Sequence, residues 1–173
     1  MRAPAQFVDL RQVRRNFARA ATSYDAVAVL QREVGSRMLE RLDYVKIEPR
    51  RVLDVGCGTG ISLTALSERY PKSQVVGADA SEAMLHTGRT QRSGLRWLLP
   101  FLRSSRSSLV SADALALPFT AGSLGLVWSN LMLHWLDDPL PAFHEIYRAL
   151  DVGGLLMFST FGPDTLKELR TSF

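Results

Sequence analysis

Cysteine is nearly absent from this sequence of 173 residues, with Cys57 as the single example. One cysteine cannot form an internal disulfide, so we expect a reducing compartment, the cytoplasm. Long apolar runs are missing as well, because polar residues interrupt the two longest, 95–102 and 124–135. Both are far shorter than the roughly 20 residues that cross a bilayer, and we expect no integral membrane segment.

A strong excess of one charge sign is also lacking. The 21 Lys and Arg residues and 17 Asp and Glu residues give a net charge of +4, which does not predict a nucleic-acid partner. His86, His134 and His144 show no ligand-like spacing, so we expect no metal site. The sequence as a whole has 46% apolar residues, a composition typical of one globular domain.

Two amphipathic patterns precede a regular alternation of strands and helices. Residues 9–21 and 26–42 repeat apolar residues at spacings of three and four, which predicts two helices. Beyond them we expect strands at 52–55, 74–78, 109–111, 124–129 and 155–160, and helices at 61–70, 81–89 and 139–150. This alternation predicts right-handed crossovers and an α/β, doubly wound, mainly parallel sheet. Such a sheet binds ligands beyond the carboxyl ends of its strands.

Two connections between these elements stand out. A short link would join the helix and strand on either side of 87–108, so we interpret this segment, rich in arginine and apolar residues, as an insertion. It is either a surface loop with an apolar anchor or a flap that docks a partner or touches a membrane. Farther on, Gly153 and Gly154 predict the end of the helix at 139–150.

A glycine-rich loop between the first predicted strand and its helix is the central signal. Its sequence, Asp54-Val-Gly-Cys-Gly-Thr-Gly60, lacks the spacing of a dinucleotide fingerprint and the Gly-Lys end of a P-loop. Glycines permit positive φ angles and close backbone approach, and the helix that follows offers free N–H groups to an anionic ligand group. Asp54 would repel a pyrophosphate but could accept a hydrogen bond from an ammonium group. The loop therefore favours a zwitterionic amino-acid ligand.

Three further positions follow predicted strands. Asp79 ends the second strand, nineteen residues after Gly60, where a carboxylate can accept hydrogen bonds from both hydroxyls of a ribose. The pair 113–114, Asp-Ala, follows the third strand and is placed to bond an adenine amino group. Asn130 ends the fourth strand, beside the reactive end of the ligand.

With these marks in this order, residues 50–160 resemble the class I S-adenosylmethionine-dependent methyltransferases. The resemblance is carried by the segment 52–60, by Asp79, by Asp113-Ala-Leu-Ala-Leu-Pro118 and by the helix end at 148–154. It implies a Rossmann-like class I fold, with S-adenosylmethionine as cofactor and S-adenosylhomocysteine as product. The cofactor-binding residues that it implies are Asp54, Gly56, Cys57, Gly58, Gly60, Asp79, Ala80, Met84, Asp113, Ala114 and Asn130.

The flanking segments narrow the resemblance. Residues 17–25, 30–35, 128–135 and 158–170 look like those of the malonyl-acyl-carrier-protein O-methyltransferases of biotin synthesis. This implies methyl transfer to the free carboxylate of a malonyl thioester, with an acyl carrier protein or a coenzyme A thioester as partner. The tail 161–170 is also similar to complex I assembly factors that hydroxylate arginine on a methyltransferase fold. The alternatives are therefore a protein arginine hydroxylase or a non-catalytic cofactor-binding fragment.

Tyr24 and His134 are the candidate catalytic residues. Tyr24 is either a lid residue over the cofactor or a helix-packing tyrosine, and His134 is either a base or part of an apolar wall. A base is not required, because a malonyl carboxylate is already ionised near neutral pH. Cys57 has no evident histidine partner, which disfavours a nucleophilic role. The arginines of residues 2–19 form either a solvated helix face or a surface that attracts an acidic carrier protein.

We expect the chain to consist of two regions, with the boundary after residue 46. We expect residues 1–46 to form an N-terminal helical arm or lid, and residues 47–173 to form a cofactor-binding core. Class I domains normally continue to a sixth and a seventh strand, so we expect the fold to be truncated after strand five. That strand, at 155–160, would then present an unpaired apolar edge, which predicts self-association.

Overall fold

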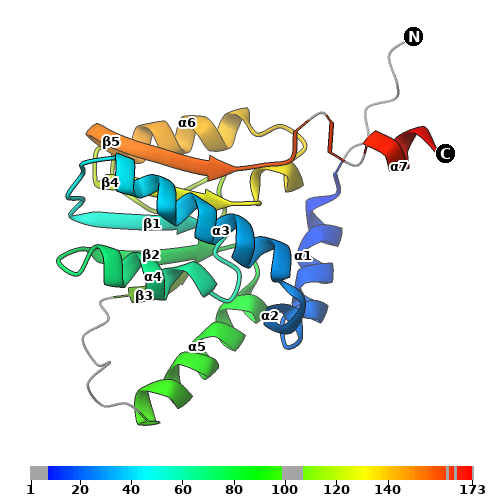
Figure 1. Ribbon diagram of the computed structural model, residues 1–173, viewed down its shortest axis with the longest axis horizontal. Coiled ribbons are helices and arrows are strands. Elements are labelled where there is room, and N and C mark those ends of the chain that lie inside the picture. The colour runs from blue at the N-terminus through cyan, green and yellow to red at the C-terminus, as the bar shows by residue number, and fades with distance from the viewer. Residues whose placement is uncertain (1–7, 99–106, 163, 166, 173) are drawn as a thin grey trace.

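A five-stranded sheet with helices on both faces makes up the fold (Figure 1). The computed structural model describes residues 8–98, 107–162, 164–165 and 167–172; part of the predicted insertion, 99–106, lies outside them. The strands are β1 (Arg51–Val55), β2 (Gln74–Asp79), β3 (Ser107–Ser111), β4 (Leu124–Asn130) and β5 (Leu150–Ser159). Their order is β3-β2-β1-β4-β5, and every neighbouring pair is parallel. The predicted α/β, doubly wound, parallel sheet is confirmed.

Helices precede and connect the strands. The elements before the sheet are α1 (Leu10–Ala20), α2 (Tyr24–Val27), α3 (Val29–Arg41) and the 3-10 turn η1 (Leu42–Tyr44). The later ones are α4 (Ile61–Arg69), α5 (Glu82–Leu98), the 3-10 turn η3 (Leu133–Trp135), α6 (Leu140–Ala149) and α7 (Lys167–Thr171). Within the described ranges, no helix is both long and apolar enough to cross a bilayer.

Alternating side chains along the central strands divide the core between the two faces of the sheet. Val52 and Trp128, both fully buried, pack with Leu63 of α4 and with residues of α3 on one face. Leu53, the next residue along β1, packs with Ile146 of α6 on the other face. Strands buried on both faces read as continuous apolar runs, which is why the runs at 52–55 and 124–129 predicted strands correctly.

The helix predicted at 26–42 is interrupted at Ala28. This buried residue has φ −75° and ψ 46°, outside the helical region, and its N–H donates to the carbonyl of Tyr24 over 2.9 Å. Alanine is compatible with a helix, so the apolar spacing could not reveal the break. The short helix α2 brings Asp25 to the loop after β1, where the Thr59 hydroxyl donates to its carboxylate over 2.6 Å.

Helix α5 is longer than predicted. It continues to Leu98, so the interpretation of 87–108 as an irregular insertion is wrong for its first part. Residues 87–93 are mostly polar and lack an apolar repeat, but they are helical, and the hydroxyls of Thr90 and Ser93 donate to carbonyls four residues earlier. Gly88 permits close packing, because a Cβ there would lie only 2.1 Å from the carbonyl oxygen of Thr59. The absence of a side chain thus lets α5 rest directly on the loop after β1.

Strand β5 begins where α6 ends, so the prediction that Gly153 and Gly154 close the helix is wrong. Both glycines lie inside the strand, and Gly153 has φ +78°. Opposite them the register on β4 shifts between Leu124 and Leu126, which marks a bulge. The far side of β5 pairs with no strand among the described residues.

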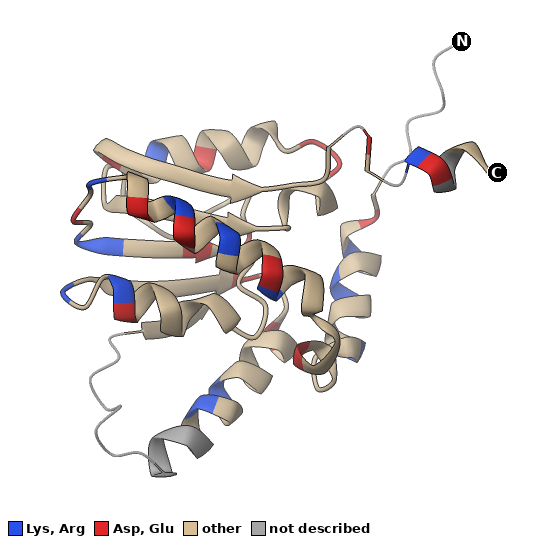
Figure 2. Ribbon diagram, viewed as in Figure 1, with Lys and Arg blue, Asp and Glu red and all other residues tan. Residues whose placement is uncertain are grey.

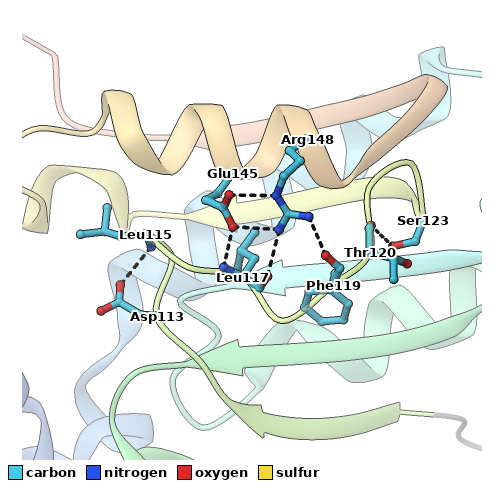
Figure 3. Close-up of polar contacts among 8 residues, drawn as sticks. All are labelled: Asp113, Leu115, Leu117, Phe119, Thr120, Ser123, Glu145 and Arg148. Carbon is cyan, nitrogen blue, oxygen red and sulfur yellow. Dashed lines mark hydrogen bonds and ion pairs between the residues drawn. The ribbon is translucent and has the colours of Figure 1, made fainter.

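Helix α6 fixes the connection between β3 and β4 (Figure 3). The Glu145 carboxylate accepts from the N–H of Leu117 over 2.9 Å, and Arg148 donates to the carbonyls of Leu117 and Phe119 over 3.0 and 2.8 Å. Arg148 also pairs with Glu145 over 2.8 Å and, with the Leu117 hydrogen bond, lowers the pKa of that carboxyl to about 2. Asp113 begins this connection, and its carboxylate accepts from the N–H of Leu115 over 3.0 Å.

Candidate functional site

Helix α1 lies beside the carboxyl ends of the strands (Figure 1). A pocket lies between this helix and the strand ends. It brings together many of the residues singled out in the sequence: Tyr24, Gly56, Gly58, Asp79, Ala80, Met84, Asp113, Ala114 and Asn130. Asp54 and Cys57 line a smaller adjoining pocket that shares Tyr24, Gly56, Gly58 and Asn130 with the first. Residues distant in the chain therefore meet at one place, as the order of parallel strands predicted.

Two glycines shape the loop after β1. Gly56 has φ +74°, and a Cβ there would lie 2.2 Å from Cγ of Met132. Gly60, with φ +85°, precedes α4, and its Cβ would lie 2.6 Å from Nη2 of Arg92. A side chain at either position would be both strained and crowded. Gly60 lines neither pocket, so its effect on the site is through the conformation of the loop.

The Asp79 carboxylate ties this loop to the start of α5. Its Oδ2 accepts from the N–H of Gly58 and its Oδ1 from the N–H of Ser81, both over 2.8 Å. Burial raises the pKa of Asp79, whereas the two hydrogen bonds and the charge of Arg14 lower it. Each oxygen retains accepting capacity, so the carboxylate can bind a diol without releasing the loop.

Asp54 is buried within β1, with 2% of its surface exposed. Burial and, second, the negative charge of Asp79 raise the pKa of Asp54 to about 8, while Arg92 acts in the opposite direction. The carboxyl is therefore largely protonated near neutral pH. A cationic group beside it would favour the ionised form and lower this pKa again.

Arg92 of α5 supports the loop after β1, a contact that the sequence analysis missed. Its guanidinium donates to the carbonyl of Gly60 over 2.6 Å and to the hydroxyl of Ser107 over 3.4 Å. Burial lowers its pKa, while Cys57 and Asp54 raise it. The available signal was helical spacing, because Arg92 follows Gly88 by four residues and so shares the face that meets the loop.

Helix α1 closes the pocket from outside. Arg14 pairs with Asp113 over 2.5 Å, and the ring of Phe17 lies 5.2 Å from that of Trp135 and 6.1 Å from that of Tyr24, each edge to face. No residue of α1 is buried. The pocket volume of about 120 Å³ is below the roughly 300 Å³ of usual small-molecule pockets.

The remaining candidates have environments that limit their chemistry. Burial, followed by the charge of Asp54, raises the pKa of Cys57 well above its usual value, so the thiol stays protonated and is a poor nucleophile. Burial and the charges of Asp79 and Asp25 raise the pKa of Tyr24. His134, in η3, lies outside the first pocket and lines a separate one with Tyr24. Burial lowers its pKa, so its ring is neutral near pH 7.

Comparison with known proteins places this geometry in a family. Residues 53–158 match the model described as a methyltransferase domain. Over 172 residues the chain is 52% identical to a malonyl-[acyl-carrier protein] O-methyltransferase of Methylovorus sp. (strain MP688), covering 99% of this chain and 57% of that protein. A protein of the same name from Gallionella capsiferriformans (strain ES-2) is 49% identical, covering 96% and 56%. The chain thus spans little more than half the length of these curated relatives.

Solved structures share the fold. A SAM-dependent methyltransferase from Aquifex aeolicus matches with a TM-score of 0.65 and 20% identity, over 82% of this chain and 71% of that one. Phospholethanolamine N-methyltransferase 2 from Haemonchus contortus matches with a TM-score of 0.60 and 24% identity, over 79% and 31%. At such identities the likeness concerns the fold alone. Because the family model spans more than half of its length, the chain belongs to the methyltransferase-domain family.

Proposed function

We propose that the protein transfers a methyl group from S-adenosylmethionine to the free carboxylate of malonyl-acyl carrier protein, in biotin synthesis. The observation that carries this proposal is the identity of 52% and 49%, over nearly the whole chain, to two malonyl-[acyl-carrier protein] O-methyltransferases. The pocket at the strand ends supports it, because its polar groups match the parts of that cofactor one by one.

Each acid at the sheet edge suits a different part of S-adenosylmethionine. Asp54, buried next to the glycine loop, would accept from the ammonium group, and Asp79 from the two ribose hydroxyls. Asp113 would accept from the adenine amino group, in place of Arg14 or beside it. The apolar side chains of Ala80, Met84 and Ala114 would pack around the adenine. Gly56, Cys57, Gly58 and Asn130 would surround the methionine part, with Gly60 supporting the loop.

S-adenosylmethionine supplies an electrophilic methyl group. Since the malonyl carboxylate is ionised near neutral pH, the protein needs to orient the acceptor and exclude water rather than remove a proton. The aromatic side chains of Phe17, Tyr24 and Trp135 meet beside the pocket and can exclude water from it once α1 is closed. We assign Tyr24 and His134 to contacts with the ligands, as a protonated phenol and a neutral ring, and not to general-base catalysis.

Helix α1 is the surface on which we place the carrier protein. It carries Arg11, Arg14, Arg15 and Arg19 and no acidic residue (Figure 2). Carrier proteins are acidic, so these arginines would attract one electrostatically. Coenzyme A presents the same thioester and is the alternative source of the malonyl group. We place the reaction in the cytoplasm, because the single cysteine requires no oxidising compartment.

The reaction is tested by incubating the protein with methyl-labelled S-adenosylmethionine and malonyl-carrier protein. We expect a labelled methyl ester, and none with acetyl-carrier protein, which lacks the free carboxylate. Absence of a labelled ester contradicts the proposal. Hydroxylated arginine in a protein substrate would favour the hydroxylase alternative, and cofactor binding without either product would favour a non-catalytic role.

Asp79→Ala should weaken S-adenosylhomocysteine binding about tenfold or more, because two ribose hydroxyls lose a charged acceptor worth about 1.5–3 kcal/mol. Calorimetric titration of the variant, with its fold checked by circular dichroism, measures the change. Asp113→Ala is the matched control and should weaken binding less, since adenine offers Asp113 a single neutral donor. Unchanged affinity in folded Asp79→Ala would remove this residue from the site.

The raised pKa of Asp54 predicts the pH dependence of cofactor binding. Pairing with an ammonium group requires the carboxylate, whereas below its pKa of about 8 the free protein holds the proton. Binding must then release a proton, so affinity for S-adenosylhomocysteine should rise with pH, by up to about tenfold per unit between pH 6 and 8. Calorimetry in buffers of different ionisation enthalpy measures the released proton. The same release by Asp54→Asn would contradict the assignment.

We also propose that the chain self-associates through β5. Its far side pairs with no described strand, and Phe158 remains 43% exposed beside that edge. Light scattering of the 173-residue chain should show dimers or larger species, and Phe158→Lys should shift them toward the monomer. A monodisperse monomer at about 100 µM protein, roughly a hundredfold above a dissociation constant of about 1 µM, would contradict this proposal.

A further inference from the structure

A second pocket adjoins the cofactor pocket beneath α1, and it is lined by His134. Its volume is about 320 Å³. The two pockets share the side chains of five residues: Val13, Phe17, Tyr24, Leu131 and Trp135. A ligand in the second pocket would therefore lie against the same wall as the cofactor.

Aromatic rings converge on this second pocket. The ring of His134 lies 4.3 Å from that of Phe161 and 5.2 Å from that of Trp135. Phe161 and Trp135 nevertheless remain 45% and 40% exposed. Partly exposed rings around a concave site favour a ligand with apolar segments.

The polar groups of the second pocket are all uncharged near pH 7. Asn16 and Gln31, whose side chains are neutral amides, line it, and among the described lining residues there is no Lys, Arg, Asp or Glu. Burial lowers the pKa of His134, so its neutral ring carries one N–H donor and one acceptor. Within the described part of the chain its Nδ1 is buried with no hydrogen-bond partner. The pocket thus offers neutral hydrogen-bonding groups between apolar rings.

We propose that the second pocket binds the arm that carries the acceptor thioester, an inference that rests on the proposed function. This arm, common to carrier proteins and coenzyme A, alternates amide groups with short alkyl segments. Its amides match Asn16, Gln31 and the ring of His134, and its alkyl segments match Phe161 and Trp135. An arm bound here places its malonyl end at the wall shared with the cofactor pocket.

Phe161→Ala tests the apolar part of this site, with Phe158→Ala as the matched control. The two phenylalanines are three residues apart and similarly exposed, at 45% and 43%, but Phe158 packs on Phe143 and lines neither pocket. The protein loaded with S-adenosylhomocysteine, which cannot donate a methyl group, is titrated calorimetrically with malonyl-pantetheine. We expect Phe161→Ala to weaken binding at least fivefold and Phe158→Ala less than twofold, with the affinity for S-adenosylhomocysteine unchanged in both.

Substitutions of His134 test the polar part of the second pocket in the same titration. His134→Leu should weaken malonyl-pantetheine binding at least fivefold, and His134→Asn, which keeps hydrogen-bonding groups, should restore part of the loss. Binding by Phe161→Ala and His134→Leu at the wild-type affinity, or no saturable binding by the wild type, would overturn the inference.

Methyl-transfer assays separate this inference from the proposed function. If the arm is recognised, Phe161→Ala should raise the KM by a similar factor for malonyl-carrier protein and for malonyl-coenzyme A. A wild-type KM in this variant with both substrates would overturn the inference while the proposed function stands. If the wild-type protein forms no ester, the proposed function is contradicted. The titration with malonyl-pantetheine still decides whether the second pocket binds the arm.

Discussion

The site depends on the close approach of three carboxyl groups at the carboxyl ends of neighbouring strands. Asp54, Asp79 and Asp113 lie on or just after β1, β2 and β3, which are neighbours in the sheet. Parallel strands bring their carboxyl ends together, so like charges gather where burial already disfavours ionisation. Burial and, second, the charge of Asp79 raise the pKa of Asp54. Much of the surrounding structure offsets this concentration of negative charge.

The groups that offset the charge differ in how firmly they are held. Arg92 lies on α5, which rests on the loop after β1 at Gly88, and backbone N–H groups hold Asp79. Arg14 lies on α1, none of whose residues is buried. One side of the pocket is therefore built into the core, and the other is attached by an exposed ion pair and a few aromatic contacts. Exposed ion pairs contribute about 0–1 kcal/mol, which is consistent with the prediction that the N-terminal helices act as a lid.

The sheet and its line of acids could be predicted from the sequence because both follow from local patterns. Strands buried on both faces give short apolar runs, and Asp54, Asp79 and Asp113 lie at or just beyond the carboxyl ends of these strands. The break at Ala28, the length of α5 and the early start of β5 could not be predicted in this way. Each depends on contacts between distant segments, such as Thr59 with Gly88 or Leu124 with Leu150. Arg92 and the pairing of Arg14 with Asp113 were missed for the same reason.

Because residues of α1 line both pockets, a single movement of this helix would open both of them. Under the proposed function, the methylated acceptor and the spent cofactor leave through the same opening. Turnover can then be no faster than the opening of α1, however rapid the chemical step is. A carrier protein bound to the arginines of α1 would hold this helix in place. Dissociation of the carrier protein and release of both products would then occur together.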